Sequence, residues 1–290
     1  MGNEIKKLEN EIDDLKRQIS DIKQELKYIS FSIENVLRRR GFNFYNSCPS
    51  GDLLIPYNVD SLINEKFYGY FKKYSFRLFM RDIIKNKNKI SLDELTRFCS
   101  VRTVRKYLNF LLKAGIISKV KENLFQLNNN RINTFGGTLE WFIAKIFLEE
   151  FHSPADWRIK LLNLKCGGDF DVIAILEGLI VFVEVKSSPP KHIHQNVISE
   201  FFMRINDLNP DLSIFFVDTH LRLKDKINVM FEWEFRKNNR MFRIENFYSK
   251  IFCVNDNIFI VNSKPDIITN IRECLKYYFS NKTTINYKFH

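Results

Sequence analysis

Paired cysteines are absent from this sequence of 290 residues. The five cysteines are odd in number, widely spaced and without a Cys-x-x-Cys pair: Cys48, Cys99, Cys166, Cys253 and Cys274. That pattern argues against both a disulfide framework and a zinc site, and it favours a reducing compartment. A chain of this length can bury a large core, in one domain or two, without such cross-links.

Long apolar segments are also absent. The longest apolar run is interrupted by Glu177 and Gly178, well short of the roughly 20 residues that a membrane-spanning helix needs. Residues 1–11 are charged throughout and lack the apolar centre of a signal peptide. These absences predict a soluble, cytoplasmic protein with no membrane partner.

Acidic residues are fewer than basic ones. The chain has 45 Lys and Arg against 34 Asp and Glu, and its net charge of +11 favours a polyanionic partner such as nucleic acid. An AT-rich coding sequence is the alternative, because Lys, Asn, Ile, Phe and Tyr are abundant and share AT-rich codons. The position of the charges must therefore decide between the two.

Residues 1–40 begin with a regular apolar pattern. Spacings of three and four residues alternate without a miss, at Ile5, Leu8, Ile12, Leu15, Ile19, Ile22, Leu26 and Ile29. This a/d heptad seam predicts a coiled coil, and Ile at a with Leu at d in the first heptads favours a parallel homodimer. A single amphipathic helix docked on the chain's own body is the alternative. Residues 41–60, which contain Pro49 and Gly51, are expected to form a connection.

Residues 60–130 carry the pattern of a small helical domain with a hairpin. A first helix is expected over 67–85, and Ser91 and Glu94 have the capping-box spacing that opens a short second helix. A third helix begins after Ser100 and ends before Gly115, which has the position of a C′ glycine. The strands expected after it, over 116–120 and 124–127, form a β-hairpin.

Three helices followed by a β-hairpin resemble a winged helix-turn-helix domain. Polar side chains share the face of the third helix opposite its apolar residues: Arg102, Arg105, Lys106, Asn109 and Lys113. A helix laid in the major groove would present these cations and this amide to DNA. Domains of this kind also serve as protein–protein modules, so the sequence leaves both roles open.

Residues 138–290 predict an α/β domain. The expected elements are a helix over 138–151, three strands over 158–164, 169–176 and 179–186, a helix over about 193–206 and a strand over 212–218. Strands over 247–254 and 258–261 and a helix over 265–279 are expected to extend or cover the sheet, with 232–240 at the surface. The strands 169–176 and 179–186 are apolar on both faces, as in a buried central hairpin, apart from four charged residues.

A two-residue loop at Glu177 and Gly178 fixes the register of that hairpin. Residues whose numbers sum to 355 then face each other, so that Asp171 lies opposite Glu184 and the four charged side chains share one face. In this register Asp169 lies opposite Lys186.

The facing carboxylates of Asp171 and Glu184 repel each other, and a bound cation is the most direct compensation. Oxygen ligands indicate Mg²⁺ or Mn²⁺, to which the Val185 carbonyl would add one more oxygen. Lys186 would hold or deprotonate a water molecule beside the ion. An exposed edge hairpin with an ordinary charge ladder is the alternative.

One spacing in this hairpin resembles the signature of the PD-(D/E)XK nuclease superfamily: Asp171 is followed by twelve residues and then by Glu184-Val185-Lys186. The ending Glu-Val-Lys-Ser-Ser is similar to that of archaeal Holliday junction resolvases and related restriction-type enzymes. The resemblance spans residues 138–218 and implies a restriction-endonuclease-like mixed sheet flanked by helices. It also implies that Asp171 and Glu184 hold metal and that Lys186 is catalytic.

Residues near this signature extend the resemblance or depart from it. Glu140 matches the glutamate on the preceding helix that completes the metal site of such resolvases, and a first-turn acid favoured by the helix dipole is its alternative. Phe170 stands where the superfamily name has Pro. His192 and His194 flank the site and are expected to contact phosphate rather than to catalyse.

The resemblance and the charge together imply a Mg²⁺- or Mn²⁺-dependent DNA endonuclease. Its expected parts are a coiled coil over 1–40, a winged helix-turn-helix over 60–130 and a nuclease-like domain over 138–290. The alternative is a catalytically silent coiled-coil DNA-binding regulator or scaffold on a nuclease fold.

Overall fold

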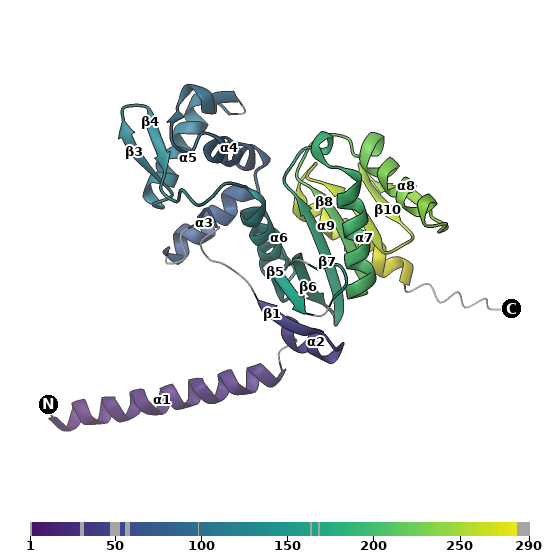
Figure 1. Cartoon of the computed structure of the whole chain (residues 1–290). Coiled ribbons are helices and arrows are strands. Elements are labelled where there is room, and N and C mark those ends of the chain that lie inside the picture. The colour runs from purple at the N-terminus through teal and green to yellow at the C-terminus, as the bar shows by residue number, and fades with distance from the viewer. Residues whose placement is uncertain are drawn as a thin grey trace.

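A mixed sheet forms the centre of the molecule (Figure 1). The computed structural model describes residues 2–29, 32–46, 53–55, 59–97, 99–162, 164–167 and 169–282. Within these residues, eight strands lie in the order β1-β5-β6-β7-β8-β11-β10-β9. Their bounds are β1 (Asn43–Asn46), β5 (Ala155–Leu162), β6 (Asp169–Leu176), β7 (Leu179–Lys186), β8 (Leu212–Val217), β9 (Ile244–Tyr248), β10 (Ile251–Val254) and β11 (Ile258–Asn262). Strands β7, β8 and β11 are mutually parallel and the other neighbours pair antiparallel, which confirms the predicted mixed α/β sheet.

Helices cover both faces of this sheet. Helices α6 (Gly136–Glu150) and α9 (Ile267–Lys282) pack on one face. Helices α2 (Ile33–Arg39), α7 (Gln195–Leu208) and α8 (Val229–Lys237) pack on the other. Because apolar layers lie on both sides, the central strands have apolar side chains in both directions, as the sequence predicts.

Some elements lie where the sequence predicts none. Residues 41–60 were expected to be a connection, but β1 lies within them and pairs with β5 at the edge of the sheet. Its four residues are too few to show a periodic pattern. Helix α8 occupies the expected surface segment 232–240, since Phe231 and Phe235 are buried one helical turn apart among charged neighbours. The expected strand 247–254 is two strands, β9 and β10, joined by a turn.

Residues 61–127 form a smaller helical segment beside the sheet (Figure 1). Its elements are α3 (Ser61–Phe71), α4 (Tyr74–Lys85), β2 (Ile90–Ser91), the 3₁₀ helix η2 (Asp93–Arg97), α5 (Val101–Lys113), β3 (Ile117–Lys121) and β4 (Leu124–Leu127). Ser100 caps α5 by accepting the Thr103 N–H at 3.3 Å, and Gly115 follows the helix with φ of +67°. The predicted third helix and hairpin are therefore confirmed, and β2 joins them in a sheet of order β2-β4-β3.

Two predictions for this segment are wrong. Residues 67–85 form parts of two helices rather than one, because Lys73 is extended with φ of −88° and ψ of 121°. The break leaves the Phe71 carbonyl free to accept a hydrogen bond from Arg77 Nη1 at 2.6 Å. Ser91 does not open a helix, because it pairs in strand β2 and the turn after it is 3₁₀.

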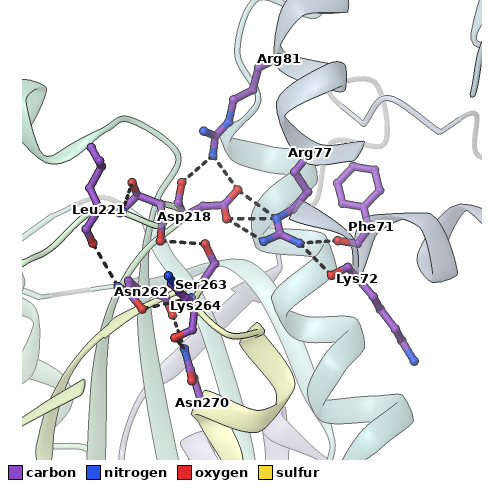
Figure 2. A network of polar contacts seen from close by, with 11 residues as sticks. Phe71, Lys72, Arg77, Arg81, Asp218, Leu221, Asn262, Ser263, Lys264 and Asn270 are labelled. Atoms are coloured by element: carbon purple, nitrogen blue, oxygen red, sulfur yellow. Dashed lines mark hydrogen bonds and ion pairs between the residues drawn. The ribbon is translucent and has the colours of Figure 1, made fainter. Parts of the chain in front are cut away.

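A buried ion cluster joins helix α4 to the end of strand β8 (Figure 2). Asp218 is fully buried, Arg77 Nη2 lies 3.0 Å from its Oδ1, and Arg81 Nη2 lies 2.6 Å from its Oδ2. Burial alone would raise the pKa of the Asp218 carboxyl, but the two guanidinium groups outweigh burial and lower that pKa. The Asp218 N–H donates to the Lys186 carbonyl at 2.9 Å, so the cluster also meets the end of β7.

Helix α1 (Gly2–Ile29) extends away from the other elements in Figure 1. Its apolar seam is 50% to 57% exposed at the positions where exposure is described, Leu8, Ile12, Leu15, Ile19 and Ile22. The predicted helix is confirmed, while its pairing with a second copy stays a prediction. No helix among the described residues has the length and apolar character that crossing a membrane would require.

We expect Asp218→Asn to lower the free energy of unfolding by about 3–5 kcal/mol at neutral pH, because it leaves the buried Arg77 guanidinium without its carboxylate. Chemical denaturation measures the change. Asp256→Asn is the matched control: it breaks an exposed pair with Arg243 and should cost less than about 1 kcal/mol.

The pH dependence of the stability of Asp218→Asn tests whether Asp218 is ionised in the folded protein. The folded pKa lies below the unfolded value of about 3.9, so the stabilisation is complete above that value and is lost as pH falls toward the folded pKa. The stability difference between wild type and variant should therefore shrink below about pH 4. An equal difference at about pH 3 and pH 7 would contradict an ionised Asp218.

Candidate functional site

The register of the β6–β7 hairpin is the one that the sequence predicts. The Cα partners run from Val172 with Val183 to Leu176 with Leu179, and each pair of numbers sums to 355. The two turn residues have positive φ of 51° and 81°, as a type I′ two-residue turn requires. The strand ends that carry the charged residues are therefore brought side by side.

Asp171, Glu184 and Lys186 meet at this end of the hairpin. Glu184 is fully buried, and its Oε1 lies 2.7 Å from Lys186 Nζ. Lys186 Nζ also lies 3.9 Å from Asp171 Oδ2, which accepts the Val185 N–H at 2.7 Å. The charged cluster thus sits inside a hairpin that is otherwise apolar, and the interpretation as a surface charge ladder is wrong.

Two arginines complete the cluster. Arg204 on α7 donates from Nη1 to both oxygens of Glu184, at 2.9 and 3.0 Å. Arg158 on β5 places its Nε 3.1 Å from Glu140 Oε2, so this glutamate of α6 reaches the same end of the sheet. Three carboxylates are therefore accompanied by three cations of the protein itself, those of Arg158, Lys186 and Arg204.

The sequence analysis misses both arginines, and only Arg204 leaves a usable signal. It lies on the helical face of Val197, Phe201 and Leu208, at spacings of three and four residues, where an apolar side chain is expected. A lone arginine in that stripe indicates a buried acidic partner. Arg158 has no such pattern around it.

The alternation of side chains between the two faces breaks at Asp171. Phe170 packs in the apolar layer beneath α7, whereas Val172 packs in the layer beneath α6. On the neighbouring strand Arg158 has φ of +53°, which is unfavourable for a residue with a side chain. Such strain persists only where its surroundings enforce it, and here it coincides with the charged cluster.

The prediction that Asp169 pairs with Lys186 is wrong because of this break. Asp169 lies beyond it, its Cα partner is Lys160 on β5, and Lys160 Nζ lies 3.5 Å from Asp169 Oδ1. A strict alternation of side chains along the strand would place Asp169 on the same face as the cluster. The irregular backbone at Asp171 instead places it on the opposite face.

The pKa values show how strongly burial and mutual repulsion act on the carboxylates of the cluster. Burial, followed by the nearby Glu184 and Glu140 carboxylates, raises the pKa of Asp171 well above its ordinary value. Burial also raises the pKa of Glu140 against the opposing effect of Arg158. Burial alone would lower the pKa of Lys186, but Glu184 and Asp171 outweigh it and raise that pKa. The surroundings thus favour the charged form of Lys186 and disfavour the charged form of Asp171.

The donor chemistry fits a hard divalent cation, which prefers carboxylate and carbonyl oxygens. A bound cation would favour the ionised Asp171 carboxylate against the burial and repulsion that raise its pKa. Within the part of the chain that the structure describes, no three His, Cys, Asp or Glu side chains gather closely enough to hold a metal ion. Arg158 holds Glu140, and Arg204 and Lys186 occupy Glu184, so the ligand set of Glu140, Asp171, Glu184 and Val185 stays a prediction.

The polar residues predicted to contact DNA lie on the outer face of α5. All five are exposed: Arg102, Arg105, Lys106, Asn109 and Lys113. The opposite face of α5 is buried, including Val104, Leu108 and Leu111. His192 and His194 are exposed in the segment that follows β7, and their contact with phosphate stays a prediction.

Comparison with known proteins gives weak similarities. No family model matches this chain, and no curated protein does. The structure of protein VC1899 from Vibrio cholerae is similar with a TM-score of 0.44 and 12% identity, over 87% of this chain and 60% of that one. The structure of Can2 from Sulfobacillus thermosulfidooxidans in complex with cyclic tetra-adenylate is similar with a TM-score of 0.47 and 14% identity, over 85% of this chain and 60% of that one. This chain therefore spans about 60% of the length of each, and values this low assign neither fold nor function.

We expect Arg204→Met to destabilise the protein in EDTA, because it removes one of the two cations that accompany the buried Glu184 carboxylate. Lys186 remains, so the cost should fall below the roughly 3–5 kcal/mol of a fully uncompensated buried charge. Added Mn²⁺ should restore more stability to the variant than to the wild type, measured as the shift in melting temperature.

Arg204→Lys is the matched control, since it keeps the charge and should behave like the wild type. Equal responses of Arg204→Met and wild type to Mn²⁺ would indicate that Arg204 and a metal ion do not share Glu184.

Proposed function

We propose that this protein is a divalent-metal-dependent nuclease that hydrolyses phosphodiester bonds in DNA with a PD-(D/E)XK type of site. The observation that carries the proposal is the meeting of Asp171, Glu184 and Lys186 in a buried hairpin, where burial and the neighbouring carboxylates raise the pKa of Asp171. The spacing of these residues is the one on which the superfamily resemblance rests.

Asp171, Glu184, Glu140 and the Val185 carbonyl would hold Mg²⁺ or Mn²⁺. Such an ion, when bound, supplies charge that stabilises the leaving oxygen and lowers the pKa of a water molecule. Glu140 would join this set by leaving its ion pair with Arg158. Both side chains of this pair are partly exposed.

Lys186 would contribute a positioned hydrogen-bond donor to the reaction. Its side chain is 26% exposed, and Nζ would donate a hydrogen bond to a water molecule or a phosphate oxygen while Glu184 fixes its position. Arg204 in turn fixes Glu184 through both carboxylate oxygens. The attacking group would thus be oriented by a chain of contacts that begins on α7.

The segment of α3–α5 and β2–β4 would act as a winged helix-turn-helix that binds DNA. The exposed cations on α5 support this role, as does the order of its helices and hairpin. Its helix α4 is joined through Asp218 to the Lys186 backbone, so bound DNA and the cluster would keep a fixed relation.

A catalytically silent DNA-binding regulator or scaffold is the second candidate. The observation that favours it is the pairing of Glu140 with Arg158 and of Glu184 with Arg204, since these pairs compensate the carboxylates without a metal ion.

A homodimer formed through α1 would place two such sites on one assembly. The apolar seam that is half exposed in the single chain is the observation that supports pairing with a second copy. Two linked sites would cut both strands of a duplex in one encounter.

We expect Glu184→Gln and Lys186→Ala to reduce Mg²⁺-dependent cleavage by a factor of about 10³ or more, while DNA affinity in EDTA persists. The assay incubates each protein with labelled duplex, nicked, single-stranded and junction DNA in Mg²⁺, Mn²⁺ or EDTA. Circular dichroism checks that each variant is folded.

Asp169→Asn is the matched control, because Asp169 pairs with Lys160 and lies outside the cluster. It should cut like the wild type. A wild type that binds DNA but cuts no substrate with either metal supports the silent regulator instead.

For the dimer, Ile12→Asp with Ile19→Asp should give a monomer by light scattering, because both changes place charge in the seam. Cleavage of supercoiled plasmid should then shift from linear to nicked product. Asn10→Asp with Ser20→Asp adds the same charge outside the seam and should leave the dimer intact. A wild type that is monomeric at about 10 μM would rule out the dimer.

A further inference from the structure

A basic pocket lies on the surface away from the charged cluster. Its volume is about 250 Å³, and its rim carries the cations Arg222, Lys224 and Lys250. Asn246 and Ser249 add an amide and a hydroxyl group to the same lining. Among the residues that the structure describes, the lining contains no carboxylate, so its charged side chains are all basic.

The floor of the pocket places it on the face of the sheet that carries the cluster. Leu223 and Phe252 form this floor and pack in the apolar layer beneath α7 and α8. Phe182 belongs to the same layer, and Glu184 and Lys186 follow it at intervals of two along β7. The pocket and the catalytic lysine therefore open on the same face.

The strand register places the pocket and the cluster at the same end of the sheet. Lys186 is level with Val217 on β8, and Val217 is level with Asn262 on β11. The pairing of Phe252 with Ile260 then brings Lys250 level with Asn262. Three strand spacings, about 14 Å, separate Lys186 from the pocket.

The three cations have no acidic partner within the described part of the chain. None of them forms an ion pair there, in contrast to Arg243 at the other end of the β9–β10 hairpin, which lies 2.5 Å from Asp256. Asp225 follows Lys224 in the sequence, but it is exposed and does not line the pocket. Uncompensated cations that converge on a concave surface attract an anion with several acceptor oxygens.

We propose that this basic pocket binds a backbone phosphate of the nucleic-acid strand whose scissile bond lies at Lys186. The inference rests on the proposed nuclease function for the identity of the strand. The phosphates of one strand of a duplex are spaced by about 3.4 Å along the helix axis and wind around it, so a direct separation of about 14 Å corresponds to at most about four nucleotides. The pocket thus holds the strand within about four nucleotides of the cut and fixes its direction across the sheet.

The test is the salt dependence of DNA binding in EDTA, where no cleavage occurs. The variant replaces Arg222, Lys224 and Lys250 with Gln, and the probe is a labelled 30-base-pair duplex. The slope of log affinity against log salt should fall by up to about 3, at about 0.9 for each lost phosphate contact. A variant with Arg236, Lys237 and Arg240 replaced by Gln removes three exposed cations at the far end of α8 and should keep the wild-type slope.

The outcomes separate this proposal from the nuclease itself. An unchanged slope in the pocket variant overturns the pocket, whether or not the wild type cuts DNA. A reduced slope in the pocket variant alone supports it, and a wild type that then fails to cut with Mg²⁺ or Mn²⁺ refutes only the nuclease.

A second measurement tests the position of the bound phosphate. A single neutral methylphosphonate linkage is placed in turn at each position within about four nucleotides of the cleaved bond, and at one of these positions it should weaken binding by the wild type and not by the pocket variant. An equal loss in both proteins at every position would contradict the placement.

Discussion

The approach of the Asp171 and Glu184 carboxylates at one end of the β6–β7 hairpin is the constraint on which the site depends. A two-residue turn fixes the register of that hairpin, and the register brings the strand ends that carry the two residues side by side. Like charges in an apolar hairpin require compensation, which Lys186 and Arg204 supply at Glu184. The hairpin and α7 therefore meet at one point, where burial and the neighbouring carboxylates raise the pKa of Asp171.

A second set of charges joins the smaller helical segment to that point. Asp218 follows β8 directly and holds Arg77 and Arg81 of α4 (Figure 2). It also donates its N–H to the Lys186 carbonyl. The segment that would bind DNA is thus connected, through α4, to the backbone of the lysine that would act on it. The parallel pairing of β7, β8 and β11 also places the ends of all three strands along one edge, where the basic pocket lies.

Much of this arrangement is predictable from the sequence because its determinants are local. The turn at Glu177 and Gly178 fixes the hairpin, and Ser100 and Gly115 mark the ends of α5. The predicted pairing of Asp169 with Lys186 was wrong because the strained backbone of the neighbouring strand interrupts the alternation of side chains. No local sequence pattern indicates this strain. Contacts between distant elements, such as Arg77 with Asp218, depend on tertiary packing that one sequence does not specify.

The most direct test of the account is diffraction from crystals of the protein grown with Mn²⁺, measured where manganese scatters anomalously. The account predicts an anomalous peak within ligand distance of Asp171 and Glu184. Arg204 or Lys186 should then have moved away from the Glu184 oxygens, from which they lie 2.9 and 2.7 Å in the present structure. A cluster without anomalous density at saturating Mn²⁺, with both cations still on Glu184, would contradict a metal-dependent nuclease and leave a site stabilised by the protein's own charges.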